Sequence, residues 1–152
     1  RYPDHMNIRA ERLAAGLSQS ALARAAHVSQ PNLSAYENGR RSPTPAVVAR
    51  LERALHVPIA QRIEHHRDAV RAIVAQHHAL HPRVFGSVAR GDATPASDLD
   101  LLVDFTADAS LLDELGLRLA LSDLLQVDVD VVATDTLRGA LRERVLGEAV
   151  PV

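Results

Sequence analysis

The sequence predicts a protein of two unlike domains, an all-helical domain followed by a small α/β domain, which together make an α + α/β fold. Apolar residues recur with the period of a helix up to about residue 78, and with the period of a strand in several segments after it. The net charge also changes sign along the chain, from +4 up to Val57 to −6 beyond it. With 152 residues and 47% hydrophobic content, the chain is long enough for two small cores.

These changes divide the chain into four predicted parts. Residues 1–6 read as a tag, as upstream read-through or as a disordered start. Residues 7–57 form the helical domain, and residues 58–80, which keep a helical period, are predicted to be a linker. Residues 81–152 form the α/β domain.

The composition excludes several classes of site and location. The chain has no cysteine, which excludes disulfides, thiolate zinc sites and cysteine nucleophiles. It has no apolar run near the roughly 20 residues of a membrane helix and no signal peptide, so we expect a cytoplasmic protein without a membrane partner. A basic first part and an acidic second part favour a polyanion and metal cations as their respective partners.

Four short helices are predicted in the first domain. The first ends at Gly16, and its apolar positions are 8, 10, 13 and 14. Ser18 and Ser29 are N-cap residues of the next two helices, and Gly39 ends the third. A fourth helix covers residues 46–57. Two capped helices joined by a tight turn are typical of a helix-turn-helix.

The second domain alternates strands and helices. Alternating apolar residues predict strands at residues 83–85, 98–105 and 127–133. Helical periodicity predicts helices at residues 110–126 and 135–149. This order is typical of a small α/β domain.

The segment 8–57, "LSQSALARAAHVSQPNLSAYENGRRSPTPAVVARLERAL" in particular, resembles the Cro/repressor (XRE) helix-turn-helix family. The resemblance implies a helix whose first residues meet base edges in the major groove, and a twofold dimer on palindromic operator DNA. Carried over by position, the residues that face bases are Gln30, Pro31, Asn32 and Ala35. Those that contact phosphates are Gln19, Asn38, Arg40 and Arg41. The alternative is a helix-turn-helix retained for dimerisation or protein docking.

The segment "VFGSVARGDATPASDLDLLVDF", residues 84–105, carries groups suited to nucleotide chemistry. Gly86 at the end of a strand allows backbone N–H groups to approach phosphate, and Ser87 adds a hydroxyl. Arg90 lies within reach of a triphosphate or, alternatively, pairs with Asp92. On a strand, Asp98 and Asp100 project to the same face, where two carboxylates can hold divalent metal ions.

Gly-Ser, ten residues and Asp-x-Asp form the signature of the polymerase-beta-like nucleotidyltransferases of the minimal (MNT) type, which this segment resembles. The resemblance implies two Mg²⁺ ions, ATP as substrate and a third carboxylate on a neighbouring strand. The candidates are Asp128 and Asp130, and "VDVV" followed by "LRERVLGEA" aligns with the family on Asp130. Asp130 is then a metal ligand or the general base.

Minimal nucleotidyltransferases of this type resemble the antitoxins that partner HEPN-type toxins. The resemblance implies AMP transfer from ATP to a toxin hydroxyl, commonly a tyrosine, and autorepression of the operon through the helix-turn-helix. The toxin and a second copy of the chain are the expected protein partners. Three alternatives remain: an antitoxin that acts by docking alone, a repressor that senses nucleotide, and a small-molecule nucleotidyltransferase, which the absence of an acceptor domain disfavours.

Overall fold

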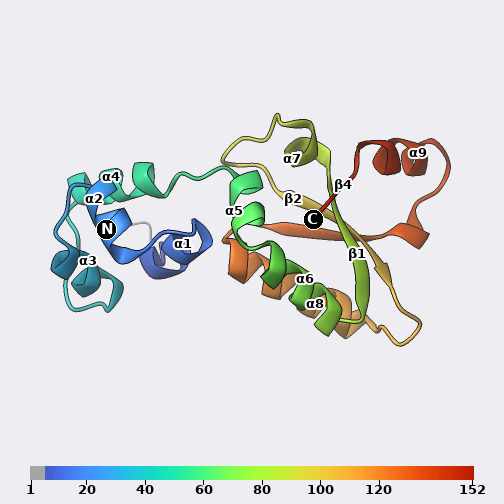
Figure 1. The fold of residues 1–152 in the computed structure, drawn as a ribbon, viewed down its shortest axis with the longest axis horizontal. Coiled ribbons are helices and arrows are strands. Elements are labelled where there is room, and N and C mark those ends of the chain that lie inside the picture. The colour runs from blue at the N-terminus through green and yellow to red at the C-terminus, as the bar shows by residue number, and fades with distance from the viewer. Residues whose placement is uncertain (1–5) are drawn as a thin grey trace. The chain divides into compact units, whose positions relative to one another are not determined.

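The computed structural model describes residues 6–152. The first five residues, part of the segment predicted to be a tag or a disordered start, lie outside the described residues. The chain divides into two compact units, Arg1–Pro58 and Ile59–Val152. The first is helical and the second combines helices with a four-stranded sheet (Figure 1), which confirms the predicted fold class.

Four capped helices build the first unit. They are α1 (Ile8–Ala14), α2 (Gln19–Ala25), α3 (Gln30–Glu37) and α4 (Pro45–Leu55). Their N-cap residues, Asn7, Ser18, Ser29 and Thr44, each accept a hydrogen bond from the backbone N–H three residues on. Such caps satisfy N–H groups that the helix itself leaves without a partner. The predicted caps Ser18 and Ser29 are confirmed.

The burial pattern of α1 differs from the prediction. Leu13, one of the apolar positions of the predicted helix, is 51% exposed, whereas Arg12 is buried. The Arg12 guanidinium binds both carboxylate oxygens of Glu37 and the carbonyl oxygen of Leu17. These partners compensate the cost of removing the Arg12 charge from water. Arg12 is therefore buried, although the apolar pattern of the helix would favour burial of its neighbour Leu13.

A mixed sheet forms the centre of the second unit. Its strands are β1 (Ala79–Phe85), β2 (Leu99–Phe105), β3 (Val129–Ala133) and β4 (Val150–Pro151), in the order β3-β2-β1-β4. β2 pairs with β1 in antiparallel and with β3 in parallel orientation. The two-residue β4 adds an antiparallel edge to β1. β4 was not predicted, because two residues are too few to show a period.

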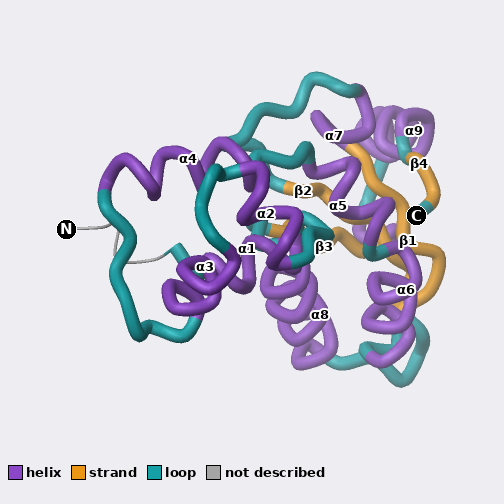
Figure 2. The backbone as a smooth tube through the Cα atoms, turned by 60° about the vertical axis from the view of Figure 1, so that its left-hand side comes forward, coloured by secondary structure: helices purple, strands orange, loops and turns teal. Residues whose placement is uncertain are grey.

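Helices cover both faces of this sheet (Figure 2). One face packs against α5 (Ile59–His65), α6 (Arg67–Gln76) and α8 (Leu111–Leu125), and the sheet contributes Leu99, Leu101 and Val103 to that core. The opposite face packs Leu102 against α9 (Gly139–Glu148). Because successive strand residues point to opposite faces, Asp100 lies on the α9 face together with Leu102.

The segment predicted to be a helical linker is helical but is not a linker. Its apolar residues Ile63, Val70 and Val74 are buried in the core of the second unit. Arg71 also donates two hydrogen bonds to the carbonyl oxygen of Val152, in the same unit. Helical period alone does not tell a linker from a helix that packs against a sheet, which explains the error.

Candidate functional site

The parallel pairing of β2 and β3 brings two of the predicted carboxylates together. Asp100 is the register partner of Asp130, within a ladder that also pairs Leu99 with Val129. Side chains of register partners project from the same face of a sheet, here the face covered by α9. Asp128, the alternative to Asp130, precedes β3, and its carbonyl oxygen accepts from the Leu99 N–H.

Gly86 packs directly against Asp100. It directly follows β1 and begins the short helix α7 (Gly86–Arg90) with a positive φ of 72°. A β-carbon added at Gly86 would stand 2.3 Å from Oδ2 of Asp100. Only glycine fits this position without displacing the carboxylate. The predicted turn, with Ser87 in its first helical turn, therefore lies against the carboxylate strand.

Asp100 is the electrostatically perturbed carboxylate of this cluster. Burial raises its pKa above the ordinary 3.8, and the negative charges of Asp130 and Asp98 raise it further. The positive charge of Arg90 acts in the opposite direction. Carboxylates that repel one another beside a half-buried strand are stabilised by a cation.

The donor set fits a divalent metal in part. Carboxylate oxygens are the ligands that Mg²⁺ prefers. Asp100 and Asp130 lie side by side on the adjacent strands β2 and β3. Asp98 precedes β2, is exposed, and acts on Asp100 through its charge. Within residues 6–152, no three or more His, Asp or Glu side chains are gathered closely enough to form a metal centre.

Arg90, a predicted ligand of the triphosphate, pairs with two carboxylates. Its guanidinium lies 3.4 Å from Asp92 and 3.3 Å from Glu148, and the side chain is 51% exposed. The pairing with Asp92 is the one that the sequence suggested as an alternative role. Glu148 was not predicted at this site, although it belongs to the "LRERVLGEA" segment used to align Asp130.

A hollow of about 240 Å³ opens beside Asp130. It is lined by Asp130 and Val131 of β3 and by Leu111, Glu114, Leu115 and Arg118 of α8. Leu111 is 84% exposed and Leu115 47% exposed. Two exposed leucines and two charged side chains of α8 thus adjoin one of the candidate catalytic residues.

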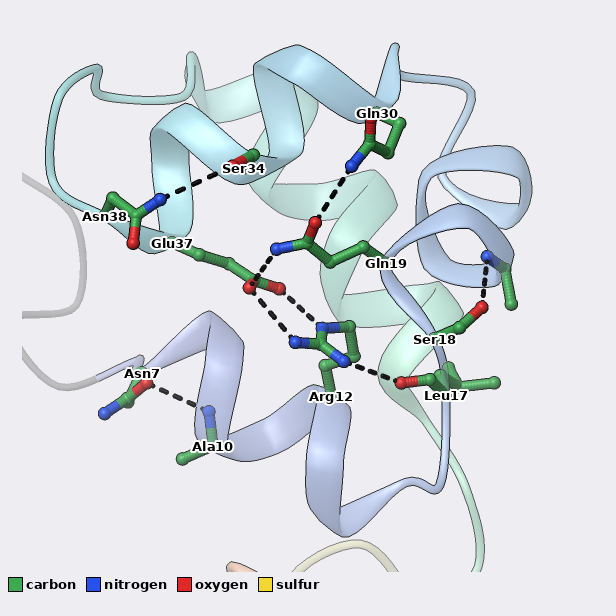
Figure 3. Close-up of polar contacts among 11 residues, drawn as sticks. Asn7, Ala10, Arg12, Leu17, Ser18, Gln19, Gln30, Ser34, Glu37 and Asn38 are labelled. Atoms are coloured by element: carbon green, nitrogen blue, oxygen red, sulfur yellow. Dashed lines mark hydrogen bonds and ion pairs between the residues drawn. The ribbon is translucent and has the colours of Figure 1, made fainter.

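The helix-turn-helix residues lie on a connected polar network (Figure 3). The Gln30 amide donates to Oε1 of Gln19, and the Gln19 amide donates to Glu37, the partner of buried Arg12. Gln19 was predicted to contact phosphate. In the structure its side chain is hydrogen-bonded to Gln30 at the start of α3 and to Glu37 at the end of that helix, and the phosphate contact stays a prediction.

The other predicted DNA contacts divide by exposure. Exposed residues are Gln30, Pro31, Asn38, Arg40 and Arg41, whereas Asn32 and Ala35 are half-buried. Arg41 donates to Oδ1 of Asn32, which links the loop after α3 to the first turn of that helix. The amide of Asn38 donates to Ser34 one turn earlier.

The chain is similar to known proteins over both units. Residues 8–61 match the helix-turn-helix family, and residues 67–151 match the nucleotidyltransferase domain family. MntA, a protein adenylyltransferase of Thermococcus cleftensis, is 44% identical over 69 residues, which are 45% of this chain and 70% of that protein.

Two further proteins are similar to part of the chain. MJ0435 of Methanocaldococcus jannaschii, named as a candidate protein adenylyltransferase, is 38% identical over 80 residues, which are 53% of this chain and 86% of that protein. A solved structure described as a candidate minimal nucleotidyltransferase is 48% identical, with a TM-score of 0.59. The match covers 64% of this chain and 98% of the other.

Proposed function

Because the chain belongs to the nucleotidyltransferase domain family, we propose that it transfers AMP from ATP to a hydroxyl group of a protein acceptor. The observation that carries the proposal is the register pairing of Asp100 with Asp130 beside the Gly86 turn. Relatives named as protein adenylyltransferases, MntA among them, support AMP as the group transferred and a protein as the acceptor.

The proposed reaction is a displacement at the α-phosphorus of ATP. The acceptor oxygen forms a bond to this phosphorus while the bond to the bridging oxygen of the β-phosphate breaks, and pyrophosphate leaves. Asp130, which the β2–β3 ladder places beside Asp100, accepts the proton of the attacking hydroxyl. Ser87 and the Gly86 turn hold the phosphates on the other side of Asp100.

Two Mg²⁺ ions held by Asp98, Asp100 and Asp130 would supply charge neutralisation for the triphosphate and activation of the acceptor hydroxyl. The raised pKa of Asp100 supports this assignment, because a cation offsets the repulsion among the three carboxylates. Without a cation, the triphosphate would meet a cluster of negative charges. We therefore expect ATP to bind together with magnesium.

We propose that the acceptor is the partner toxin of a toxin-antitoxin pair, of the HEPN type, modified on a tyrosine. Leu111 and Leu115, exposed leucines of α8 that border the hollow beside Asp130, offer apolar contact area to a protein surface. The helix-turn-helix, matched over residues 8–61, would bind operator DNA as a dimer and repress the operon that encodes both proteins.

The test is incubation of labelled ATP, Mg²⁺ and the product of the adjacent gene with the wild-type protein or with the double variant Asp98→Ala, Asp100→Ala. We expect the acceptor to be labelled by the wild-type protein alone. Equal labelling by both proteins would overturn the catalytic assignment. Protection from toxicity by an inactive double variant would instead identify neutralisation by docking.

A further inference from the structure

A carboxylate that the proposed reaction does not use lies at the Gly86 turn. Glu148 is the last residue of α9, and its side chain is 20% exposed. One carboxylate oxygen accepts from the backbone N–H of Gly86 at 3.1 Å, and the other accepts from Nη1 of Arg90 at 3.3 Å. A single carboxylate therefore engages a backbone donor and a guanidinium donor together.

Both donors are groups that the proposed function assigns to the triphosphate. A backbone N–H carries one hydrogen, so its bond to Glu148 weakens any bond to a phosphate oxygen. The Arg90 guanidinium has several donors, but its contact with Glu148 directs one of them away from the nucleotide. Glu148 thus takes the place of an anionic ligand at this turn.

The charge of Glu148 adds to this competition. It is one of the negative charges that raise the pKa of Asp100, together with Asp130 and Asp98. A triphosphate at the same turn would face this carboxylate at short range. Moving Glu148 away would remove the repulsion and free both donors, and a glutamate side chain has several staggered rotamers through which to move.

We propose that Glu148 is a nucleotide gate, a positioning residue whose carboxylate competes with the triphosphate of ATP for the Gly86 N–H and the Arg90 guanidinium. ATP binds as Glu148 leaves these donors, and Glu148 returns to them when the nucleotide is absent. The inference rests on the proposed function, because it requires ATP to bind at the Gly86 turn.

The experiment measures ATP binding by calorimetry, in the full chain with Mg²⁺ and at constant ionic strength. Glu148→Gln keeps a carbonyl oxygen for the Gly86 N–H and removes the negative charge. We expect it to bind ATP about three- to fivefold more tightly, the range for a partly exposed ion pair. Glu143→Gln is the matched control, because it removes the same charge from an exposed position of α9 and should leave affinity unchanged.

A second background tests the role of Arg90. In an Arg90→Gln protein, Glu148→Gln should have a smaller effect on ATP affinity, because the guanidinium for which Glu148 and ATP compete is absent. In the transfer reaction, Glu148→Gln should lower the KM for ATP and leave kcat unchanged. A merely structural residue would lower kcat or stability instead.

The outcomes separate the two proposals. ATP binding that depends on Asp98 and Asp100 but is unchanged or weaker in Glu148→Gln would overturn the gate and leave the proposed function standing. A fall in affinity would make Glu148 a ligand or support of the nucleotide site. Failure of the wild-type protein and of all variants to bind ATP would overturn both.

Discussion

Gly86 and Asp100 are in direct contact: a β-carbon on Gly86 would stand 2.3 Å from Oδ2 of Asp100. The contact joins the end of β1 to the start of β2, two strands that pair in antiparallel orientation. It therefore places the turn that we assign to the phosphates against the carboxylate that we assign to the metal. A substitution that displaces one of these two residues is therefore expected to displace the other as well.

The first prediction concerns Gly86→Ala. The left-handed backbone costs alanine about 1 kcal/mol, and the added methyl group displaces Asp100. We expect AMP transfer to fall at least about a hundredfold, as expected when metal-centred charge stabilisation is disrupted. Gly91→Ala is the matched control, because Gly91 has a φ of 79° but open space around its β-carbon position. Equal losses of activity in the two variants would show that strain, not the contact, matters.

The second prediction concerns the third carboxylate. Asp130→Asn should reduce AMP transfer about a thousandfold, because it removes both the proposed base and a metal ligand. Asp128→Asn should remain active, since Asp128 lies outside the β2–β3 ladder. The measurement is the initial rate of acceptor labelling. A reversed order of the two rates would assign the role to Asp128.

The third prediction concerns stability without metal. Asp100 carries a raised pKa because burial and the neighbouring carboxylates disfavour its charge. Asp100→Asn should therefore raise the melting temperature of the metal-free protein at neutral pH. Magnesium should narrow the difference by stabilising the wild-type protein alone. A lower melting temperature for the metal-free variant would contradict this account.

The fourth prediction concerns the buried pair of Arg12 and Glu37. Removing one partner leaves an uncompensated buried charge, so Glu37→Gln should lower the free energy of unfolding of the helical unit by about 3 kcal/mol. Glu52→Gln, at an exposed position of α4, should have little effect. The measurement is denaturant unfolding followed by circular dichroism.

The same pair gives a pH dependence. Burial raises the pKa of Glu37, but the hydrogen bonds from Arg12 and Gln19 outweigh it and hold the pKa below the ordinary 4.5. A lowered pKa in the folded state contributes stability that is complete above the unfolded value and is lost as the pH falls through the folded value. The difference between wild type and Glu37→Gln should therefore be constant above about pH 5 and shrink below it. A difference that grows on acidification would refute the assignment.

The fifth prediction concerns DNA. Arg40→Ala should weaken binding to all sequences and reduce the slope of affinity against salt by about one unit. Gln30→Ala should instead relax sequence preference in selection from random duplexes. Arg53→Ala, which removes the same charge from an exposed position of α4, is the control. Unchanged affinity of the Arg40 variant for random DNA would contradict the phosphate assignment.

Local patterns predicted much of this structure. Ser18 and Ser29 cap their helices. The segments in which apolar residues alternate overlap the strands β1, β2 and β3. Such patterns did not predict contacts between side chains that are distant in the sequence. The burial of Arg12 depends on Glu37, 25 residues away, and the position of Glu148 at Gly86 depends on a separation of 62 residues. A period describes one element at a time, so it does not tell which distant side chains share a face.

The parallel ladder between β2 and β3 has a consequence for how such proteins diverge. Backbone hydrogen bonds, not the connecting segment, set the alignment of Asp100 with Asp130. The connection itself contains α8, whose exposed leucines border the hollow beside Asp130. Substitutions or insertions on the outer side of this connection would therefore change the lining of the hollow without moving the carboxylates. If the acceptor binds at this hollow, we expect changes in α8 to give new acceptors while the chemistry stays the same.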